Sequence, residues 1–197
     1  MLNRDFYIHD DVVKISRNLL GKVLYTFADQ QVTAGKIVET EAYCGMSDKA
    51  SHAYPNRKTR RNQIMFEEGG VAYVYLIYGI HCLFNVVTGS KGIPNAVLIR
   101  ALEPLVGLDV MCHRRQKTQS FKITSGPGSL SSAMGINLSL YGSSLQSDKV
   151  WIEDQGEDIP ENKIISTTRI GVEHAGDDAL LPWRFYILDN PWISKKR

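Results

Sequence analysis

Val38-Glu39-Thr40-Glu41-Ala42-Tyr43 is the stretch that decides the fold, and it closes residues 32–43, a run rich in Val, Ile and Thr. Such a run predicts a β-strand. Side chains alternate between the faces of a strand, so we expect Glu39, Glu41 and Tyr43 together and the alternate residues, Val38 among them, opposite. Two carboxylates beside an aromatic ring fit either the solvent side of an edge strand or a functional site. The segment alone leaves both open.

Further strands are predicted on both sides of this segment. Residues 22–27, 71–78, 80–88, 96–103 and 184–188 are rich in Val, Ile, Tyr and Phe and are bounded by Gly, Asn or Pro. Helices are predicted at 11–21, at 105–117 and from Ser125-Gly126-Pro127-Gly128, where Pro suits a first turn. Residues 155–160 should form an exposed loop. The pattern predicts an α+β fold, with residues 1–197 as a single domain.

Composition narrows the class of protein. The 197 residues are 43% hydrophobic and 22% charged, enough for one core without a metal or disulfide staple. The three cysteines, Cys44, Cys82 and Cys112, are odd in number and lack zinc-finger spacing, so we interpret them as free thiols in a reducing, intracellular compartment. The apolar stretches are shorter than the roughly 20 residues of a membrane span. We therefore expect a soluble protein with no membrane partner and no metal site.

Basic residues are clustered although the formal net charge is only +2. Such clusters fit phosphate contacts, but each is equally compatible with a solvated face or a frayed tail. The three groups are Arg57, Lys58, Arg60 and Arg61; His113, Arg114, Arg115 and Lys117; and Lys195, Lys196 and Arg197.

Arg100 lies inside residues 96–102, an apolar run that predicts a strand buried on both faces. Desolvating a guanidinium without a partner costs several kcal/mol, so Arg100 should meet an acceptor. Glu39, Glu41 and Glu103 are the candidate carboxylates. A structural salt bridge is the alternative to a catalytic role.

Residues 73–85 predict two strands joined at Tyr78-Gly79, with Gly able to supply a tight turn. This hairpin places an aromatic ring near an exposed tip, where it could wedge between stacked bases or be a stray surface Tyr. His52 precedes the first basic group and is predicted to be a loop histidine used for stacking or hydrogen bonding rather than for metal binding. Gly-rich phosphate motifs and a Gly-x-Ser-x-Gly elbow are absent, which excludes the common nucleotide and hydrolase classes.

Taken together and in order, these segments resemble the alkyladenine (3-methyladenine) DNA glycosylase family. The resemblance covers essentially the whole chain. The chain begins close to where the family's catalytic core begins, so we expect the compact form of the family. The matching stretches are residues 38–43, 50–52, 59–62, 65–66, 73–79, Asn85, 98–104, 125–128, 169–172, 174–176, 184–186 and 191–192.

The resemblance implies a curved, antiparallel-rich sheet with surrounding helices and a protruding β-hairpin that enters the DNA minor groove. It also implies a base-excision-repair enzyme that flips alkylated, and also deaminated or etheno, purines out of double-stranded DNA and hydrolyses the N-glycosidic bond, leaving an abasic site. Tyr78 is then expected to fill the gap in the duplex. The other residues expected at the DNA are Gly79, Ile80, His81, Arg57 and Thr59.

The resemblance also assigns roles within a base pocket. The flipped purine is expected between Tyr43 on one face and His52 with Tyr75 on the other, and a cationic alkylated base gains about 0.5–2 kcal/mol on aromatic faces. Glu41 is expected to deprotonate the attacking water. The resemblance further places Arg100 and a backbone carbonyl near Val172 at the water, and Asn85 against the amino group of guanine. Glu39 shares the face of Glu41 but should lie one step further from the stacked base, so we expect it to support Arg100 or the basic loop.

The family uses water rather than an enzyme amine, so a monofunctional enzyme without cofactor or Schiff-base lysine is expected. Lys36 should point away from the site by strand alternation. We expect a monomer located with the DNA, in the bacterial cytoplasm or a nucleus. Residues 88–95 depart from the family pattern, and this puts the pocket rim and the lesion range in doubt. Two alternatives stay open: a catalytically silent DNA-damage-binding protein, against which Glu41 argues, and a hydrolase of free nucleosides, which would not need Tyr78.

Overall fold

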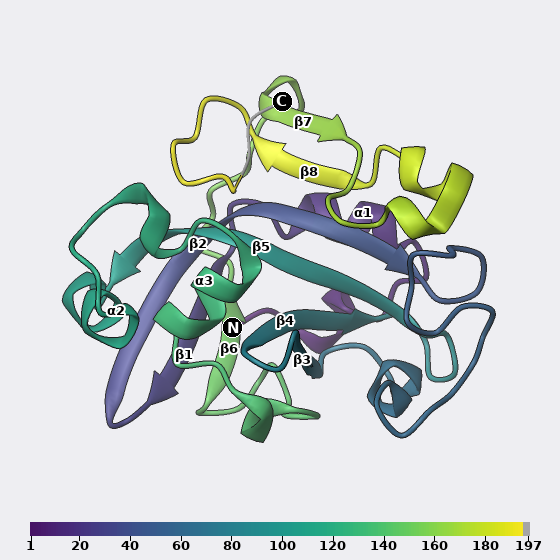
Figure 1. Ribbon diagram of the computed structural model, residues 1–197, viewed down its shortest axis with the longest axis horizontal. Coiled ribbons are helices and arrows are strands. Elements are labelled where there is room, and N and C mark those ends of the chain that lie inside the picture. The colour runs from purple at the N-terminus through teal and green to yellow at the C-terminus, as the bar shows by residue number, and fades with distance from the viewer. Residues whose placement is uncertain (195–197) are drawn as a thin grey trace.

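The computed structural model describes residues 1–194, so the basic group at 195–197 lies outside the described residues. Its framework is an eight-stranded sheet in which six strands follow the order β3-β4-β5-β2-β1-β6 and β8 pairs with both β2 and β7. Every strand pair is antiparallel. In Figure 1, α3 lies over the β4–β5 part of the sheet while α1 lies behind β2. The predicted α+β class is confirmed.

The elements have the following bounds. The strands are β1 (Val23–Ala28), β2 (Gln31–Cys44), β3 (Ala72–Ile77), β4 (His81–Thr88), β5 (Asn95–Val106), β6 (Val150–Glu153), β7 (Ile164–Thr167) and β8 (Arg184–Ile187). The α-helices are α1 (Val12–Asn18), α2 (Leu108–Arg115) and α3 (Pro127–Ala133). Short 3-10 helices are η1 (Arg4–Phe6), η2 (Gln63–Phe66), η3 (Phe121–Ile123), η4 (Leu138–Leu140), η5 (Glu161–Lys163) and η6 (Glu173–Leu180).

All six predicted strands are present, and two further strands of four residues each, β6 and β7, were not predicted. The predicted helix at 105–117 is shorter and begins at Leu108, since Leu105 and Val106 extend β5. Helix α1 begins where Asp11 accepts a hydrogen bond from the Lys14 amide at 3.0 Å. Helix α3 has Pro127 in its first turn, as predicted.

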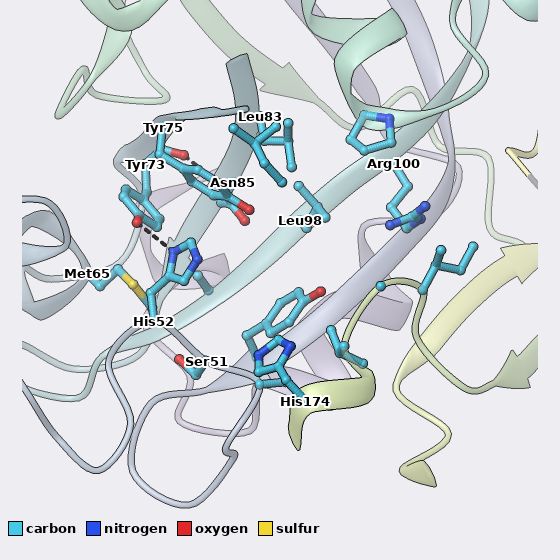
Figure 2. Close-up of a pocket in the computed structure, with 18 of the residues that line it drawn as sticks. Ser51, His52, Met65, Tyr73, Tyr75, Leu83, Asn85, Leu98, Arg100 and His174 are labelled. Atoms are coloured by element: carbon cyan, nitrogen blue, oxygen red, sulfur yellow. Dashed lines mark hydrogen bonds between the residues drawn. The ribbon is translucent and has the colours of Figure 1, made fainter. Parts of the chain in front are cut away.

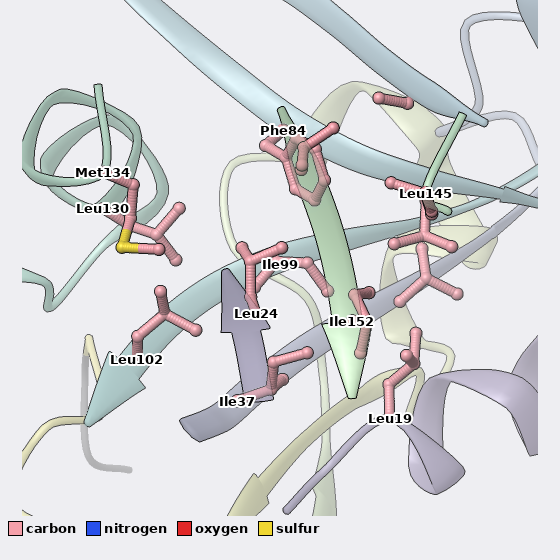
Figure 3. Close-up of a cluster of buried hydrophobic side chains, with 14 of the residues drawn as sticks. Leu19, Leu24, Ile37, Phe84, Ile99, Leu102, Leu130, Met134, Leu145 and Ile152 are labelled. Atoms are coloured by element: carbon pink, nitrogen blue, oxygen red, sulfur yellow. The ribbon is translucent and has the colours of Figure 1, made fainter. Parts of the chain in front are cut away.

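The main core lies between the sheet and the helices that cover it (Figure 3). Ile37, Phe84 and Ile99 from the sheet pack with Leu19 near the end of α1 and Leu130 from α3. Each large apolar side chain stabilises the fold by about 1.5–3 kcal/mol when fully buried. The core thereby fixes β2 and β5, the two strands on which the charged residues of the site are carried.

The predicted alternation along β2 is wrong at Val38. The register shifts between Ile37 and Glu39 and again between Glu39 and Thr40, so Val38 on β2 and Arg100 on β5 fall between paired positions. A bulge of this kind turns side chains to the other face of a strand. Val38 therefore packs in a separate cluster with β8 and the C-terminal segment, away from Ala42, which joins the main core.

Candidate active site

A cavity of about 480 Å³ opens where the β3–β4 hairpin meets the ends of β2 and β5. This volume lies within the usual range of small-molecule sites, about 300–1,000 Å³. Figure 2 shows His52, Tyr73 and Asn85 on one side of the cavity and Arg100 on the other. Its lining also includes Tyr43, Ser51, Met65, Tyr75, Leu83, Leu98, Pro127, Ile170, Val172 and His174.

One wall of the cavity is a cluster of three aromatic rings. The His52 ring meets the Tyr75 ring at 4.6 Å and 73°, and its Nδ1 lies 2.9 Å from the Tyr73 hydroxyl. His52 keeps an exposed edge, yet the burial of its ring, together with the charge of Arg61 and the proximity of His174, lowers its pKa to about 4. The imidazole is thus neutral at pH 7 and adds no positive charge to the wall.

The sequence prediction did not include the groups that hold this wall. The buried Asn62 side chain donates from Nδ2 to the His52 carbonyl at 2.8 Å and to the Arg57 carbonyl at 2.9 Å. The backbone amide of Thr59 donates to Asn62 Oδ1 at 2.6 Å. Thr59 therefore helps to fix the loop, in addition to its predicted place at the DNA.

Tyr43 forms part of the opposite wall and is supported from behind. The Arg169 guanidinium lies 4.8 Å from the Tyr43 ring centre and 5.3 Å from that of Trp183. Arg169 is buried and bonds both carboxylate oxygens of Asp48 and the Ala42 carbonyl. Arg169 lies in one of the stretches that resemble the family, but its support of Tyr43 was not predicted from the sequence.

Glu41 lies behind the cavity lining and is completely buried. Its Oε2 accepts from the Tyr43 hydroxyl at 2.7 Å and from Arg100 Nη1 at 3.1 Å, while Oε1 accepts from the Ile170 amide at 2.8 Å. Burial opposes the charge on Arg100, but the carboxylates of Glu41 and Glu39 outweigh this effect and raise the Arg100 pKa. The guanidinium and the carboxylate thus form a charged pair directly beneath the pocket.

Glu39 is the second partner of Arg100, and the prediction that a carboxylate neutralises this buried cation is confirmed. Arg100 Nε donates to Glu39 Oε1 at 3.1 Å, and Arg184 Nε donates to the same oxygen at 2.7 Å. The third candidate, Glu103, instead accepts from Asn190 and pairs with Lys36. Lys36 does not line the cavity and pairs with Glu103 and Glu157.

The buried Asn85 and Leu98 lie next to each other in register on β4 and β5 and complete the pocket floor. Asn85 donates from Nδ2 to the Tyr73 carbonyl at 3.0 Å, which fixes its amide orientation. Val172 lines the cavity, but its carbonyl accepts the Ala175 amide at 2.9 Å. One of its two lone pairs is therefore already used.

The hairpin tip projects its apolar side chains into solvent. Tyr78 is 87% exposed and Ile80 72% exposed. Tyr78 and Gly79 both have positive φ, and the Ile80 amide bonds the Ile77 carbonyl, the pattern of a tight two-residue turn. The turn holds the Tyr78 ring at the mouth of the cavity, which it helps to line.

The basic groups differ in their surroundings. Arg57, Lys58, Arg60 and Arg61 are exposed on the loop next to the pocket. In the second group, Arg114 donates to the Ala28 and Ala133 carbonyls and Arg115 to the Ile123 carbonyl. Phosphate binding by Arg114 and Arg115 is thus the weaker interpretation, since their donors already stabilise the ends of neighbouring elements.

Four further features expected from the sequence concern the loop at residues 88–95, the cysteines, metal-binding groups and membrane-spanning helices. Within residues 88–95, Ser90 and Asn95 bond Asp10, and none of these residues lines the cavity. The three cysteines are free thiols. Among the described residues no cluster of His, Cys, Asp and Glu could hold a metal ion. Over residues 1–194 no helix combines the length and apolar character needed to cross a bilayer.

The cavity has aromatic walls suited to a flat ring system, a buried carboxylate–guanidinium pair beneath them and an exposed hairpin beside its mouth. The sequence model of the methylpurine-DNA glycosylase (MPG) family matches residues 5–191. The chain belongs to this family.

Curated relatives extend over nearly the whole chain. A protein of Clostridium novyi (strain NT), named "Putative 3-methyladenine DNA glycosylase", is 43% identical over 203 residues, covering 99% of this chain and 98% of that protein. Proteins with the same name occur in Chlamydia felis (44% identical; 95% of this chain, 96% of that protein) and Bacillus cytotoxicus (43%; 96% and 97%).

Proposed function

We propose that this chain is a 3-methyladenine DNA glycosylase of base-excision repair, which binds damaged purines extruded from duplex DNA and hydrolyses their N-glycosidic bond. Family membership and the names of the relatives support the glycosylase activity. The observation that carries the finer mechanism is the position of Glu41, buried against the pocket and held by three donors.

Those three hydrogen bonds specify what Glu41 can still do. A carboxylate offers about four acceptor positions, two on each oxygen. Oε2 uses both of its positions, for Tyr43 and Arg100, whereas Oε1 accepts only from Ile170 among the described residues. The remaining position on Oε1 is therefore the one we assign to the attacking water, with Arg100 and the Val172 carbonyl as further contacts.

The chemical step then balances with water as the nucleophile. The water oxygen bonds to the anomeric carbon as the bond from that carbon to the purine nitrogen breaks, and one water proton passes to Glu41 Oε1. The electron pair of the broken bond stays on the purine. A purine alkylated on a ring nitrogen is cationic and leaves as a neutral base, so it needs no proton from the enzyme.

The walls of the cavity suit a flat, cationic base. Tyr43 on one side and His52 with Tyr75 on the other can enclose its two faces; since the His52 and Tyr75 rings lie at 73° to each other, one of them can stack while the other meets the base edge-on. Aromatic faces attract cations by about 0.5–2 kcal/mol. The neutral His52 ring avoids repelling such a base. Asn85, held by the Tyr73 carbonyl, is placed to crowd the exocyclic amino group of guanine.

The exposed hairpin supplies the group that replaces the extruded nucleotide. Tyr78 can fill the space left in the base stack, which offsets part of the few kcal/mol that extrusion costs. Ile80 and His81 are exposed beside it, and Arg57 and its basic neighbours can contact phosphates. We therefore propose minor-groove entry by this hairpin and action by a monomer.

A water nucleophile also implies that the enzyme lacks lyase activity. Among residues 1–194, those that line the cavity include no lysine, so this part of the chain places no amine to form a Schiff base with the sugar. Treatment with borohydride should therefore trap no covalent adduct between the protein and alkylated DNA. A borohydride-trapped adduct would refute the water-only mechanism.

The decisive experiment measures release of 3-methyladenine from methylated duplex DNA by wild type and by Glu41→Gln. We expect release by wild type, and from Glu41→Gln a loss of at least the 10²-fold typical of a general base, with lesion binding retained. A wild type that binds lesions but releases nothing would establish the damage-binding alternative. Release from free nucleosides with no affinity for duplex DNA would establish the nucleoside hydrolase instead.

A further inference from the structure

A second buried carboxylate, Glu39, lies next to the proposed catalytic pair and does not line the cavity. It is completely buried, like Glu41 two residues along the same strand. The bulge at Val38 and Arg100 brings both carboxylates to one guanidinium, with Glu39 at Nε and Glu41 at Nη1. Arg100 is thus gripped at two of its three nitrogens by two different acids.

The third nitrogen of Arg100 contacts the C-terminal segment. Arg100 Nη2 lies 3.4 Å from Ser194 Oγ, and this hydroxyl in turn donates to Glu39 Oε1 at 2.7 Å. The Ser194 backbone amide donates to Glu39 Oε2 at 2.5 Å. Ser194 therefore closes a ring of contacts with Glu39 and Arg100, remote in sequence from both.

The C-terminal segment that carries Ser194 is itself anchored. The Ile193 carbonyl accepts from Ser125 Oγ at 2.8 Å, and the Ile193 side chain packs with Val38 and Ala101. The Trp192 ring meets the Phe121 ring edge-on at 5.1 Å. The position of Ser194 beneath Arg100 is thus set by packing and does not depend on Glu39 alone.

Charges within this cluster balance. Glu39 and Glu41 are opposed by Arg100 and Arg184, and all four side chains are buried. Four donors converge on Glu39: two guanidinium groups, one hydroxyl and one amide. Three of these donors bond Oε1 and one bonds Oε2, and Arg184 and Ser194, which supply three of the four, do not line the cavity. Glu39 is thus held from the side away from the pocket, which suits a support rather than a base.

We propose that Glu39, backed by Ser194, is a positioning residue that fixes the Arg100 guanidinium for the reaction at Glu41, so that the segment 191–194 belongs to the catalytic apparatus. This inference rests on the proposed function. Without Glu39, Arg100 would keep one acid partner and could turn toward Glu41. That movement would shift the guanidinium N–H groups that we assign to the water, and it would leave unchanged the aromatic walls that we assign to base binding.

The test separates chemistry from binding in Glu39→Gln, with Glu103→Gln as the matched control. Glu103 is a half-buried carboxylate on β5 that pairs with Lys36 and Asn190 and does not contact Arg100. In Glu39→Gln the amide NH2 meets a donor whichever way it is placed. We expect the single-turnover excision rate to fall roughly 10- to 100-fold, as for loss of a hydrogen bond to a charged group.

In the same variant the affinity for lesion-containing DNA should stay within about twofold of wild type, while Glu103→Gln should match wild type in both. Since Glu39→Gln alters a buried charge and can impair folding, Ser194→Ala and Ser194→Thr provide a gentler pair. Ser194→Ala removes a hydroxyl bonded to the charged Glu39 and Arg100, but the Ser194 amide and the direct Arg100–Glu39 bond remain. It should therefore slow excision roughly 10-fold, at the low end of the range for hydrogen bonds to charged groups, and Ser194→Thr should restore the rate.

Each outcome bears on a distinct claim. Wild-type activity with excision unchanged in both Glu39→Gln and Ser194→Ala would overturn the positioning role and leave the proposed function intact. A parallel loss of rate and lesion affinity, unrelieved by Ser194→Thr, would also overturn it, because it would indicate a general structural defect. Absence of release by wild type would overturn the proposed function and the inference together.

Discussion

Tyr43→Phe tests the two proposed tasks of Tyr43 separately. The ring stands in the pocket wall with Arg169 behind it, and the hydroxyl donates to Glu41 at 2.7 Å. Burial first, and the adjacent Glu41 second, raise the Tyr43 pKa well above its ordinary value, so the hydroxyl stays protonated and remains a donor at neutral pH. Phe keeps the ring and removes only this donor.

The magnitude follows from the hydrogen bonds that Glu41 has. A hydrogen bond to a charged group contributes about 1.5–3 kcal/mol. Losing one of three such bonds should let Glu41 shift from the geometry that aims Oε1 at the water. If that loss is expressed fully in the transition state, the excision rate falls roughly 10- to 150-fold, at about 1.36 kcal/mol per factor of ten. Stacking is preserved, so lesion affinity should change little.

The assay is single-turnover excision of 3-methyladenine from duplex DNA, paired with fluorescence anisotropy for binding to the same lesion. Tyr25→Phe is the control, because Tyr25 lies on β1 and its hydroxyl contacts only the loop residue Gln155 among described partners. Tyr43→Leu should lose affinity as well as rate, since it removes the ring. A Tyr43→Phe protein as fast as wild type would refute the claim that this hydroxyl supports Glu41.

Three further predictions concern the hairpin and the aromatic wall. Because the Tyr78 ring is exposed, Tyr78→Ala should change the free energy of unfolding by no more than about 0.5 kcal/mol in urea titrations. The same variant should slow excision from duplex DNA roughly 5- to 150-fold in single-turnover assays. Gly128→Ala should weaken duplex binding by about 1 kcal/mol in anisotropy titrations, because its Cβ would lie 3.1 Å from the His81 ring and displace the hairpin. The pKa of His52 is lowered to about 4 against about 6.5 in the unfolded chain, so the unfolded state binds more protons between these values and stability falls as pH drops through this window. Urea titrations at pH 7 and 4.5 should show that the free energy of unfolding falls less in His52→Gln than in wild type. An equal fall in both proteins would contradict the lowered pKa of His52.

Strand composition and turn residues were sufficient to predict six of the eight strands in the described residues and the exposed hairpin tip. Apolar context also predicted that Arg100 is buried and must meet a carboxylate. The same signal was present at Arg184, a charged residue in a strand-forming run, but it was not used. Alternation could not predict the bulge at Val38. Strand β2 pairs with β1, β5 and β8 along its length, and the register shift arises where these pairings are fitted together.

The supports of the pocket were beyond prediction for a different reason. Asp48 and Arg169 join loops that are distant in sequence, and Asn62 ties together residues of its own loop. A polar residue in a loop gives no periodic signal of its partner. The resemblance located the segments that contain them without indicating their contacts. Such positions become visible only when every buried polar group is required to have a partner.

That requirement also separates the two carboxylates that alternation placed on one face. Glu39 accepts four hydrogen bonds, three on Oε1 and one on Oε2, and Arg184 and Ser194, which supply three of them, do not line the cavity. The three donors to Glu41 belong to Tyr43, Arg100 and Ile170, all of which line it. The two acids share one arginine and differ in whether their other partners face the pocket. The sequence repeats Glu at positions 39 and 41, but the bulge and the Ser194 contacts give the repeat two different chemistries.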